Sequence, residues 1–472
     1  MRTPSTTLRL AGAGLALVLT LLAAGPARAQ RAATGVDWST FGFDLQRTGQ
    51  NPSETTIGVG NAGQLHLLWS FHVNATTVSQ AMVADGVLIR GTPTQVVYVG
   101  AESGYVFAVR ASTGQQIWKR FVGIEETTDN CGGPYGVDGS VTIDRSTNRL
   151  YVPGGDDKAY ALDLSTGAIA SGWPVTVSAN VLHEHLWSGL TLNQGRLYVP
   201  VASYCDQPPY RGRVTVIDAA TATVLGSWFV TGRHGPYGGG VWGTGGVSID
   251  PANNDVYAAT GNALAFPENP PYADAVVRLT PNLRVRDWNS PNLVAGDIDF
   301  GTTPTLYQAP GCPAQLVAPN KSGVLFLYDR DSIGAGPAQS VTVSQLDGTL
   351  QTVAAYSPAQ NMVYVASGSS FGTYTHGLLA FSVQSDCTLQ LAWQQTAGVD
   401  ATAPEGSPTV ANGVVYFGDG YGNQYHAYDA SNGTPLWDSG SDVSGPAWSA
   451  PTVVNGMLYF GAADGFLRAY GP

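Results

Sequence analysis

The chain has 472 residues, of which 59 are glycine and 29 are proline, and only 12% are charged. Aromatic residues make up 10% of it, which excludes a disordered chain, and the abundance of turn residues argues against long helices. The formal net charge of −12 argues against a general nucleic-acid binder and against a polybasic membrane-surface protein.

The N-terminus has the pattern of a secretory signal. Arg2 and Arg9 precede the apolar run 10–22, and Ala27-Arg28-Ala29 follows it. A basic start, a short apolar stretch and an A-x-A site are typical of a signal peptide. The run is shorter than the roughly 20 residues of a membrane-spanning helix. We therefore predict a signal peptide over residues 1–29 and a secreted or periplasmic mature chain with no membrane span.

A sequence pattern recurs along the rest of the chain. An apolar-Tyr-apolar triplet is followed by a second apolar run, a Thr-Gly turn and a tryptophan, as in residues 97–118 and 150–173. Its short apolar runs alternate with polar residues and are broken by glycine, which is typical of strands. Repeating units of roughly 50 residues with about four strands each are typical of propeller blades.

The repeats predict eight blades in a closed ring. Trp69 lies before the first full unit, and the last unit ends before its final strand, so the N-terminal segment can supply that strand. The repeat tryptophans are expected to dock between adjacent blades as structural residues. They are Trp69, Trp118, Trp173, Trp228, Trp288, Trp393 and Trp437, with a vacancy near residue 340.

The four cysteines indicate two disulfides, because an even number in an exported protein favours pairing. Three pairings are possible. We favour Cys131–Cys205 and Cys312–Cys387, since each pair sits at matching points of neighbouring repeats. No C-x-x-C-H motif occurs, so we expect no covalently attached haem in this chain.

A histidine pair lies on the loop that enters the fourth repeat, in His183-Glu184-His185. Two histidines flanking a glutamate could bind a transition metal, but the spacing is not H-E-x-x-H and no third ligand is evident. We expect His185 to hydrogen-bond a polar ligand, such as a cofactor, or a neighbouring blade.

The Ala-x-Asp-x-x-Thr-Gly-x-x-x-Trp repeat, with the opening segment 38–44 (Trp-Ser-Thr-Phe-Gly-Phe-Asp), resembles the pyrroloquinoline quinone (PQQ) type propellers. That family includes quinoprotein alcohol and polyvinyl-alcohol dehydrogenases, and also outer-membrane assembly propellers that bind no cofactor. The resemblance covers nearly the whole mature chain. It implies an all-β fold, an eight-bladed β-propeller of four-stranded blades over residues 30–472, closed by the N-terminal strand.

The segment 240–262 resembles the dehydrogenase stretch that carries a floor tryptophan and a metal-ligand asparagine. The resemblance implies that Trp242 lies flat beneath the quinone. It also implies that Asn262 gives its amide oxygen to a hard cation such as calcium. The alternatives are a second core tryptophan and an ordinary Gly-Asn turn.

Asp297-Ile298-Asp299 resembles the D-x-D motif of the same enzymes. Residues i and i+2 of an extended chain point the same way, so both carboxylates can face one ion. The resemblance implies that Asp297 is the general base and that Asp299 is the extra carboxylate of lanthanide-using members. Lys321 resembles the cation that contacts the quinone oxygens. The alternatives are a solvated acid pair and a turn lysine.

The sequence also departs from the dehydrogenase pattern. Those enzymes have a metal-ligand glutamate before an R-G-x-V strand, whereas in the stretch 203–214 the nearest carboxylate is Asp206, one methylene shorter. The disulfide between adjacent cysteines is absent, because only Cys131 occupies that region. No counterpart of the Asn-Trp pair over the cofactor is found near residues 352–358.

These observations lead to two hypotheses. The first is an exported quinoprotein dehydrogenase that oxidises a small-molecule or polymeric alcohol with PQQ and a calcium or lanthanide ion, and passes the electrons to a separate acceptor. The second is a cofactor-free propeller used as a binding or assembly scaffold. The departures favour the scaffold. Trp242, Asn262, Asp297 and Lys321 together favour the enzyme.

Overall fold

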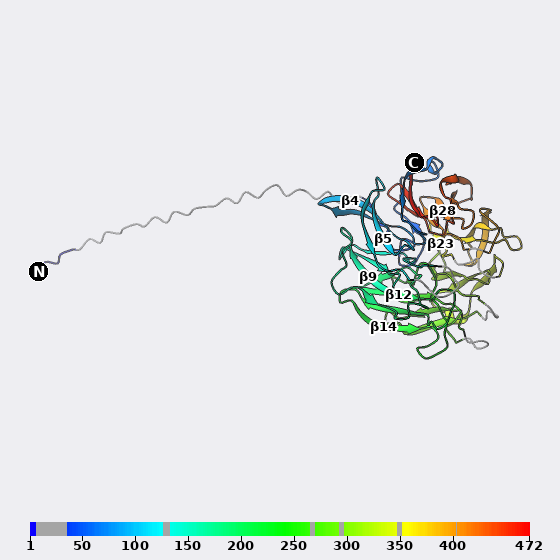
Figure 1. Ribbon diagram of the computed structural model, residues 1–472, viewed down its shortest axis with the longest axis horizontal. Coiled ribbons are helices and arrows are strands. Elements are labelled where there is room, and N and C mark those ends of the chain that lie inside the picture. The colour runs from blue at the N-terminus through cyan, green and yellow to red at the C-terminus, as the bar shows by residue number, and fades with distance from the viewer. Residues whose placement is uncertain (6–34, 126–132, 265–269, 292–296, 347–351, 403) are drawn as a thin grey trace. The chain divides into compact units, whose positions relative to one another are not determined.

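The computed structural model describes residues 1–5, 35–125, 133–264, 270–291, 297–346, 352–402 and 404–472 (Figure 1). Most of the predicted signal peptide and Cys131 lie outside these residues. Residues 33–472 form one compact unit, which contains all the described strands. Among the described residues, no helix has the length and apolarity needed to cross a bilayer.

Strands β3 to β33 form eight antiparallel sheets in chain order, which are the blades of a β-propeller. Blade 1 contains β3 (Met82–Ile89), β4 (Thr92–Gly100), β5 (Tyr105–Arg110) and β6 (Gln116–Phe121). Blade 2 contains β7 (Thr142–Asp144), β8 (Arg149–Pro153), β9 (Lys158–Asp163) and β10 (Val175–Thr176). Blade 3 contains β11 (Thr191–Asn193), β12 (Arg196–Val201), β13 (Arg213–Asp218) and β14 (Thr223–Phe229). Blade 4 contains β15 (Ser248–Ile249), β16 (Val256–Ala259), β17 (Val276–Leu279) and β18 (Val285–Asn289).

The second half of the ring repeats this arrangement. Blade 5 contains β19 (Thr305–Tyr307), β20 (Gln315–Pro319), β21 (Val324–Asp329) and β22 (Gln339–Thr342). Blade 6 contains β23 (Ala355–Ser357), β24 (Met362–Ser367), β25 (Gly377–Val383) and β26 (Leu389–Gln395). Blade 7 contains β27 (Thr409–Ala411), β28 (Val414–Gly418), β29 (Tyr425–Asp429) and β30 (Pro435–Asp438). Blade 8 contains β31 (Thr452–Val454), β32 (Met457–Gly461) and β33 (Phe466–Gly471). In the described part of the chain, three 3₁₀ turns lie between strands: η1 (Ala62–Gln64), η2 (Ile333–Ala335) and η3 (Gly440–Asp442).

The N-terminal segment closes the ring, as the incomplete last repeat predicts. Strand β2 (His66–His72) pairs antiparallel with β33 and completes blade 8. The short strand β1 (Gln50–Asn51) pairs parallel with β27 and adds a fifth strand to blade 7. Figure 1 shows these blue N-terminal segments beside the red C-terminal strands. The start and the end of the propeller are therefore joined through backbone hydrogen bonds.

Repeat tryptophans join neighbouring blades, in agreement with their predicted structural role. Four indole Nε1 groups donate to backbone carbonyls of the next blade: Trp69 to Ala111 (2.8 Å), Trp118 to Leu164 (2.9 Å), Trp393 to Ala430 (3.2 Å) and Trp437 to Leu65 (2.9 Å). Trp288 differs, because it is 36% exposed and packs edge-on against Tyr272. At the predicted vacancy, β22 carries no tryptophan.

The Thr-Gly turn of the repeat is shaped to receive these indoles. A Cβ atom at Gly167 would lie 2.7 Å from the ring of Trp118, and Gly114 and Gly433 make similarly close approaches to Trp69 and Trp393. Gly167 also has a positive φ of 67°. The glycine of each turn therefore provides both the left-handed backbone and the space for the ring.

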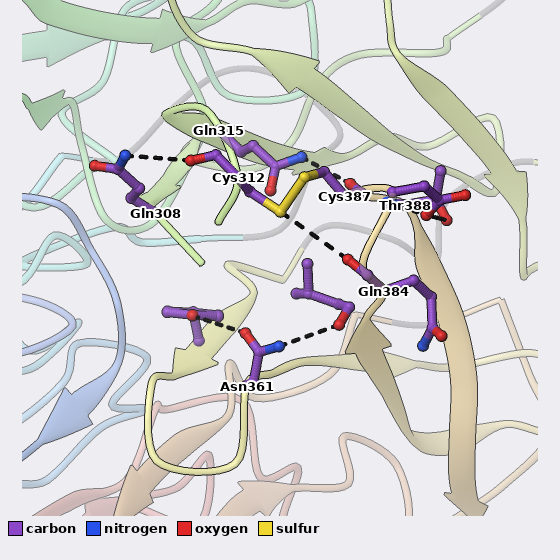
Figure 2. Close-up of a disulfide and its surroundings, with 10 residues drawn as sticks. Gln308, Cys312, Gln315, Asn361, Gln384, Cys387 and Thr388 are labelled. Atoms are coloured by element: carbon purple, nitrogen blue, oxygen red, sulfur yellow. Dashed lines mark hydrogen bonds between the residues drawn. A yellow bond between two sulfur atoms is a disulfide. The ribbon is translucent and has the colours of Figure 1, made fainter. Parts of the chain in front are cut away.

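A disulfide joins blades 5 and 6. Cys312 and Cys387 are bonded with a Cα–Cα distance of 5.5 Å (Figure 2). Gln315 Nε2 donates to the Cys387 carbonyl at 2.9 Å and reinforces the same junction. This pairing is confirmed. The pairing of Cys131 with Cys205 stays a prediction, because Cys131 lies outside the described residues.

We predict that Gly167→Ala destabilises the propeller more than Gly195→Ala. Gly195 has a similar φ of 74°, but a Cβ atom there would meet nothing within 4 Å, so the pair separates backbone strain from indole contact. Left-handed strain alone should cost Gly195→Ala about 1 kcal/mol of unfolding free energy. The clash with Trp118 should bring the loss for Gly167→Ala to about 3 kcal/mol, measured by urea unfolding. Equal losses would contradict the docking role of the glycine.

Candidate cofactor and metal site

Loops from several blades surround one cavity of about 1000 Å³. In an antiparallel blade, the turn between the second and third strands and the connection to the next blade emerge at the same face. Asp206 and Lys321 lie in turns between the second and third strands of their blades. Trp242, Asp297 and Asp299 lie in connections between one blade and the next. All five line the cavity. The fold therefore brings together residues that are far apart in the sequence.

Three carboxylates cluster in one part of the cavity wall. Asp206, Asp297 and Asp299 each have a carboxylate oxygen within 4.8 Å of the other two. Lys321 Nζ lies 2.5 Å from Asp297 Oδ1 and 2.7 Å from Asp299 Oδ2. The lysine ammonium therefore bridges the two ends of the D-x-D motif and compensates part of the negative charge of the cluster.

The two aspartates of the motif differ in exposure and in acidity. The side chain of Asp299 is 1% exposed, whereas that of Asp297 is 56% exposed. Burial raises the pKa of Asp299 well above its ordinary value, although Lys321 opposes this shift. Burial also acts to raise the pKa of Asp297, but hydrogen bonds with Asp299 and Lys321 outweigh it and lower that pKa. Asp297 is therefore the ionised and accessible member of the pair.

Asn262 completes the cluster. Its backbone N–H donates to Asp299 Oδ1 at 2.8 Å. One end of its side-chain amide faces Asp206 Oδ2 at 3.2 Å and Asp299 Oδ1 at 2.8 Å. An NH₂ group at this end would donate to both carboxylates, whereas an amide oxygen there would need a cation to hold the three oxygens together. Both arrangements bring Asn262 into the coordination range of the acidic cluster.

Trp242 is a half-buried wall residue of this cavity. Its Nε1 has no hydrogen-bond partner among the described residues, and its ring makes an edge contact with Tyr210 at 6.3 Å. A Cβ atom at Gly261 would lie 1.9 Å from Asp299 Oδ1 and 2.7 Å from the indole nitrogen. The glycine therefore allows the tryptophan and the buried aspartate to approach each other. This position does not suit the alternative of a core tryptophan.

His185 occupies a different position from the one expected of a cofactor ligand. It is fully buried and is not among the described residues that line the cavity. Its Nε2 lies 2.6 Å from Asp138 Oδ2, and its ring stacks on Tyr204 at 4.8 Å. The contact with Asp138 fits the alternative of a hydrogen bond to a neighbouring blade. Contact with a ligand in the cavity does not fit this geometry.

Sequence reasoning missed several residues of the wall. Glu102, Glu405 and Trp448 line the cavity, and Trp187 lies there two residues after the buried His185. Trp448 could have been found, because like Trp242 it stands outside the register of the repeat tryptophans. The two glutamates carry no comparable signal, since each is a single acid in a loop.

We predict that Lys321→Met destabilises the protein and that a polyvalent cation restores part of the loss. Without the ammonium group, the ionised Asp297 loses its counter-charge and both aspartates lose a hydrogen-bond donor, which should cost about 3 kcal/mol. The matched control is Lys158→Met, whose ion pair with Asp156 is partly exposed and should contribute less than about 1 kcal/mol. Thermal unfolding with and without La³⁺ measures both. Equal stability of the two variants would contradict the role of Lys321.

Family models match two parts of the chain. Residues 38–186 match the glucose/ethanol/alcohol dehydrogenase β-propeller domain, and residues 386–471 match the outer membrane protein assembly factor BamB. A polyvinylalcohol dehydrogenase from Pseudomonas sp. is 22% identical over 350 residues, which are 63% of this chain and 50% of the relative. The chain spans about half the length of the curated relatives it matches.

Solved structures share the fold at lower identity. The quinohemoprotein alcohol dehydrogenase from Comamonas testosteroni has a TM-score of 0.72 at 17% identity, covering 92% of this chain and 80% of its own. A europium-containing methanol dehydrogenase has a TM-score of 0.70 at 15% identity, covering 92% and 98%. The resemblance of this chain to the PQQ-type eight-bladed propellers is thereby confirmed, in its sequence repeat and in its fold.

Proposed function

We propose that the protein is a quinoprotein dehydrogenase that oxidises an alcohol with PQQ and a hard polyvalent cation in this cavity. The observation that carries the proposal is the convergence of Asp206, Asn262, Asp299, Lys321 and Trp242 around one space. The names of its relatives, polyvinylalcohol dehydrogenase and quinohemoprotein alcohol dehydrogenase, agree with this chemistry.

The donor set fits a hard cation. Carboxylate and amide oxygens are the ligands preferred by calcium and by other hard ions. Asp206, Asn262 and Asp299 would hold the ion, and Asp297 lies beside them. Three carboxylates against one ammonium group favour a trivalent ion over a divalent one. Asp206 would thus be the metal ligand in place of the longer glutamate that the dehydrogenase pattern has.

The quinone fits only together with such a cation. PQQ is a flat polycarboxylate, and the half-buried Trp242 offers an aromatic face to a flat ring. Lys321 is the one cationic side chain among the described residues that line the cavity, and it already pairs with Asp297 and Asp299. An anionic quinone would therefore need the metal ion to offset the negative charge of the wall.

The chain's own residues would handle the proton of the alcohol. When bound, the quinone supplies the two-electron oxidant of the reaction. Asp297 is exposed to the cavity and has a lowered pKa, so it is ionised at neutral pH and can accept the hydroxyl proton. Lys321 orients this carboxylate through its 2.5 Å contact. Asp299 also contacts the Lys321 ammonium group, at 2.7 Å, and helps to hold it in place.

Export and the electron acceptor are further parts of the proposal. The N-terminal pattern of residues 1–29 supports secretion to the periplasm or the medium, with residues 30–472 as the mature propeller domain. The chain has no C-x-x-C-H motif for haem attachment. We propose that a separate carrier takes the electrons from the reduced quinone.

Quinone uptake should depend on a polyvalent cation. The purified protein should retain about one PQQ per chain after gel filtration with La³⁺ or Ca²⁺, and none without a polyvalent cation, as measured by absorbance. Trp242→Ala should abolish retention, whereas the control Trp288→Ala, at a partly exposed repeat tryptophan, should not. If no quinone is retained with either ion, the cofactor-free scaffold becomes the better account, in line with the C-terminal family match.

Removal of the proton acceptor should stop turnover without loss of the quinone. Asp297→Asn should keep the quinone but reduce dye-coupled alcohol oxidation at least roughly 100-fold, because no other ionised carboxylate is as exposed in the cluster. The control is Asp331→Asn, at an exposed aspartate that pairs with Arg278. An Asp297→Asn variant with normal turnover would refute the general-base assignment and leave quinone binding untouched.

A further inference from the structure

Glu405 and Trp448 form the wall of the cavity that faces the acidic cluster. Glu405 lies in the connection that enters blade 7, and Trp448 in the one that enters blade 8. In a ring of eight, blades four positions apart lie opposite each other, so these connections face blades 3 and 4. Asp206 lies in blade 3, and Trp242 lies in the connection to blade 4. Glu405 and Trp448 both line the same cavity as those residues.

Glu405 is a buried carboxyl group with unused hydrogen-bonding capacity. It is 8% exposed, and its Oε2 has no hydrogen-bond partner among the described residues. Burial, with the nearby charge of Asp419, raises its pKa well above the ordinary glutamate value. Asp419 is already engaged, since its Oδ2 lies 2.7 Å from His426 Nε2. A buried polar group without a partner is costly, so its place on a cavity wall points to a ligand.

The neighbouring loops keep Glu405 beside Trp448. Gly420 and Ala447 form a backbone bridge, and the Ala447 N–H donates to the Gly420 carbonyl at 3.0 Å. A Cβ atom at Gly420 would lie 3.1 Å from Glu405 Oε2. The residue after Ala447 is Trp448, whose Nε1 also has no partner among the described residues. A carboxyl group and an indole are therefore presented together on one wall.

The lining of the whole cavity is strongly acidic. Its described residues include five carboxyl side chains, Glu102, Asp206, Asp297, Asp299 and Glu405, and the single ammonium group of Lys321. Lys321 is paired within the acidic cluster. No cation among the described lining residues is left for the opposite wall. A cation bound in such a cavity favours the ionised form of the carboxyl groups around it, whereas an anion opposes their ionisation and finds no free cation to pair with.

We infer that Glu405 is a specificity-determining residue, which with Trp448 admits neutral and cationic alcohols and rejects anionic ones. The inference rests on the proposed dehydrogenase function and names the substrate class of the same cavity. Glu405 would accept a hydrogen bond from an ammonium group or exchange one with a hydroxyl group. The indole face of Trp448 would pack against the alkyl chain or the cation. Burial favours the neutral form of Glu405, but an ammonium group beside it would shift it to the carboxylate and form an ion pair, whereas an anionic end group would find no free cation on this wall.

The test uses three substrates that share a four-carbon chain and differ in charge. They are 1-butanol, 4-amino-1-butanol and 4-hydroxybutane-1-sulfonate, whose sulfonate is a weak metal ligand. With the protein loaded with PQQ and La³⁺, dye-coupled kcat/KM for the amino alcohol should equal or exceed that for butanol. The sulfonate should be at least roughly tenfold poorer. Equal kcat/KM for the sulfonate and butanol would overturn the inference.

A variant and its matched control test whether Glu405 determines the preference for charge. Glu405→Gln, which cannot become a carboxylate, should lower the ratio of kcat/KM for 4-amino-1-butanol to that for 1-butanol by roughly tenfold, while the control Asp331→Asn, outside the cavity lining, should leave this ratio unchanged. An unchanged ratio in a Glu405→Gln variant that melts like the parent protein would refute the role of Glu405. If that variant does not fold, the substrate series on the parent protein still decides the charge preference.

A binding measurement separates this inference from the proposed function. The tryptophan fluorescence of the protein without quinone or metal is titrated with butylammonium and with butane-1-sulfonate, since Trp187, Trp242 and Trp448 line the cavity. Butylammonium should bind saturably and at least roughly tenfold more tightly than the sulfonate. A protein that takes up no quinone but shows this preference would refute the dehydrogenase alone. A protein that takes up quinone and binds both ions equally would refute the inference alone.

Discussion

The closure of the ring is the constraint on which the rest of the structure depends. Blade 8 is incomplete without β2, and the pairing of β2 with β33 joins the start of the propeller to its end. Each blade is a small sheet that buries its faces only against its neighbours. The indole–glycine contacts, such as Trp118 with Gly167, and the Cys312–Cys387 disulfide fix successive blades to one another. A closed ring then holds loops of distant blades at fixed positions around one cavity.

Electrostatics decides what such a cavity can bind. Several carboxyl groups and one ammonium group line the cavity. The ammonium group of Lys321 contacts both Asp297 and Asp299 and so reduces the repulsion between these carboxyl groups. Burial of Asp299 raises its pKa, whereas the accessible Asp297 has a lowered one. The cluster therefore combines Asp297, which is ionised and can accept a proton, with Asp299, which is buried and contacts Lys321. Because carboxyl groups outnumber cations in the site, we expect it to bind a polyvalent cation. A flat anionic quinone would bind only together with that cation.

The fold could be predicted largely from the sequence because the repeat is local. The alternation of apolar and polar residues defines strands, and the missing last strand indicates closure by the segment around Trp69. The exposure of Trp288 could not be foreseen, since it depends on how the neighbouring blade covers the ring. The parallel pairing of β1 with β27 was also unforeseen, because two residues carry no periodic signal.

The candidate site was predictable only in part. The resemblance to the dehydrogenases named Trp242, Asn262, Asp297 and Lys321, and the fold brings these residues to one cavity or its acidic cluster. The burial of His185 follows from tertiary packing that its local sequence does not encode. Glu405 was missed because opposite walls of a propeller come from blades widely separated in the sequence, and only the position of Trp448 outside the repeat register marks that wall. Residues from distant blades line one cavity only in the closed ring, so the sequence does not show which of them do so.

The proposed role of the acidic cluster as a cation site is tested most directly by anomalous diffraction. Crystals grown with PQQ and a lanthanide should show one strong anomalous peak about 2.3–2.6 Å from oxygens of Asp206, Asn262 and Asp299, with the quinone beside it on Trp242. The account would be contradicted by crystals with no peak in the cavity, in which Lys321 still bridges the two aspartates and the amide of Asn262 still faces the carboxylates alone.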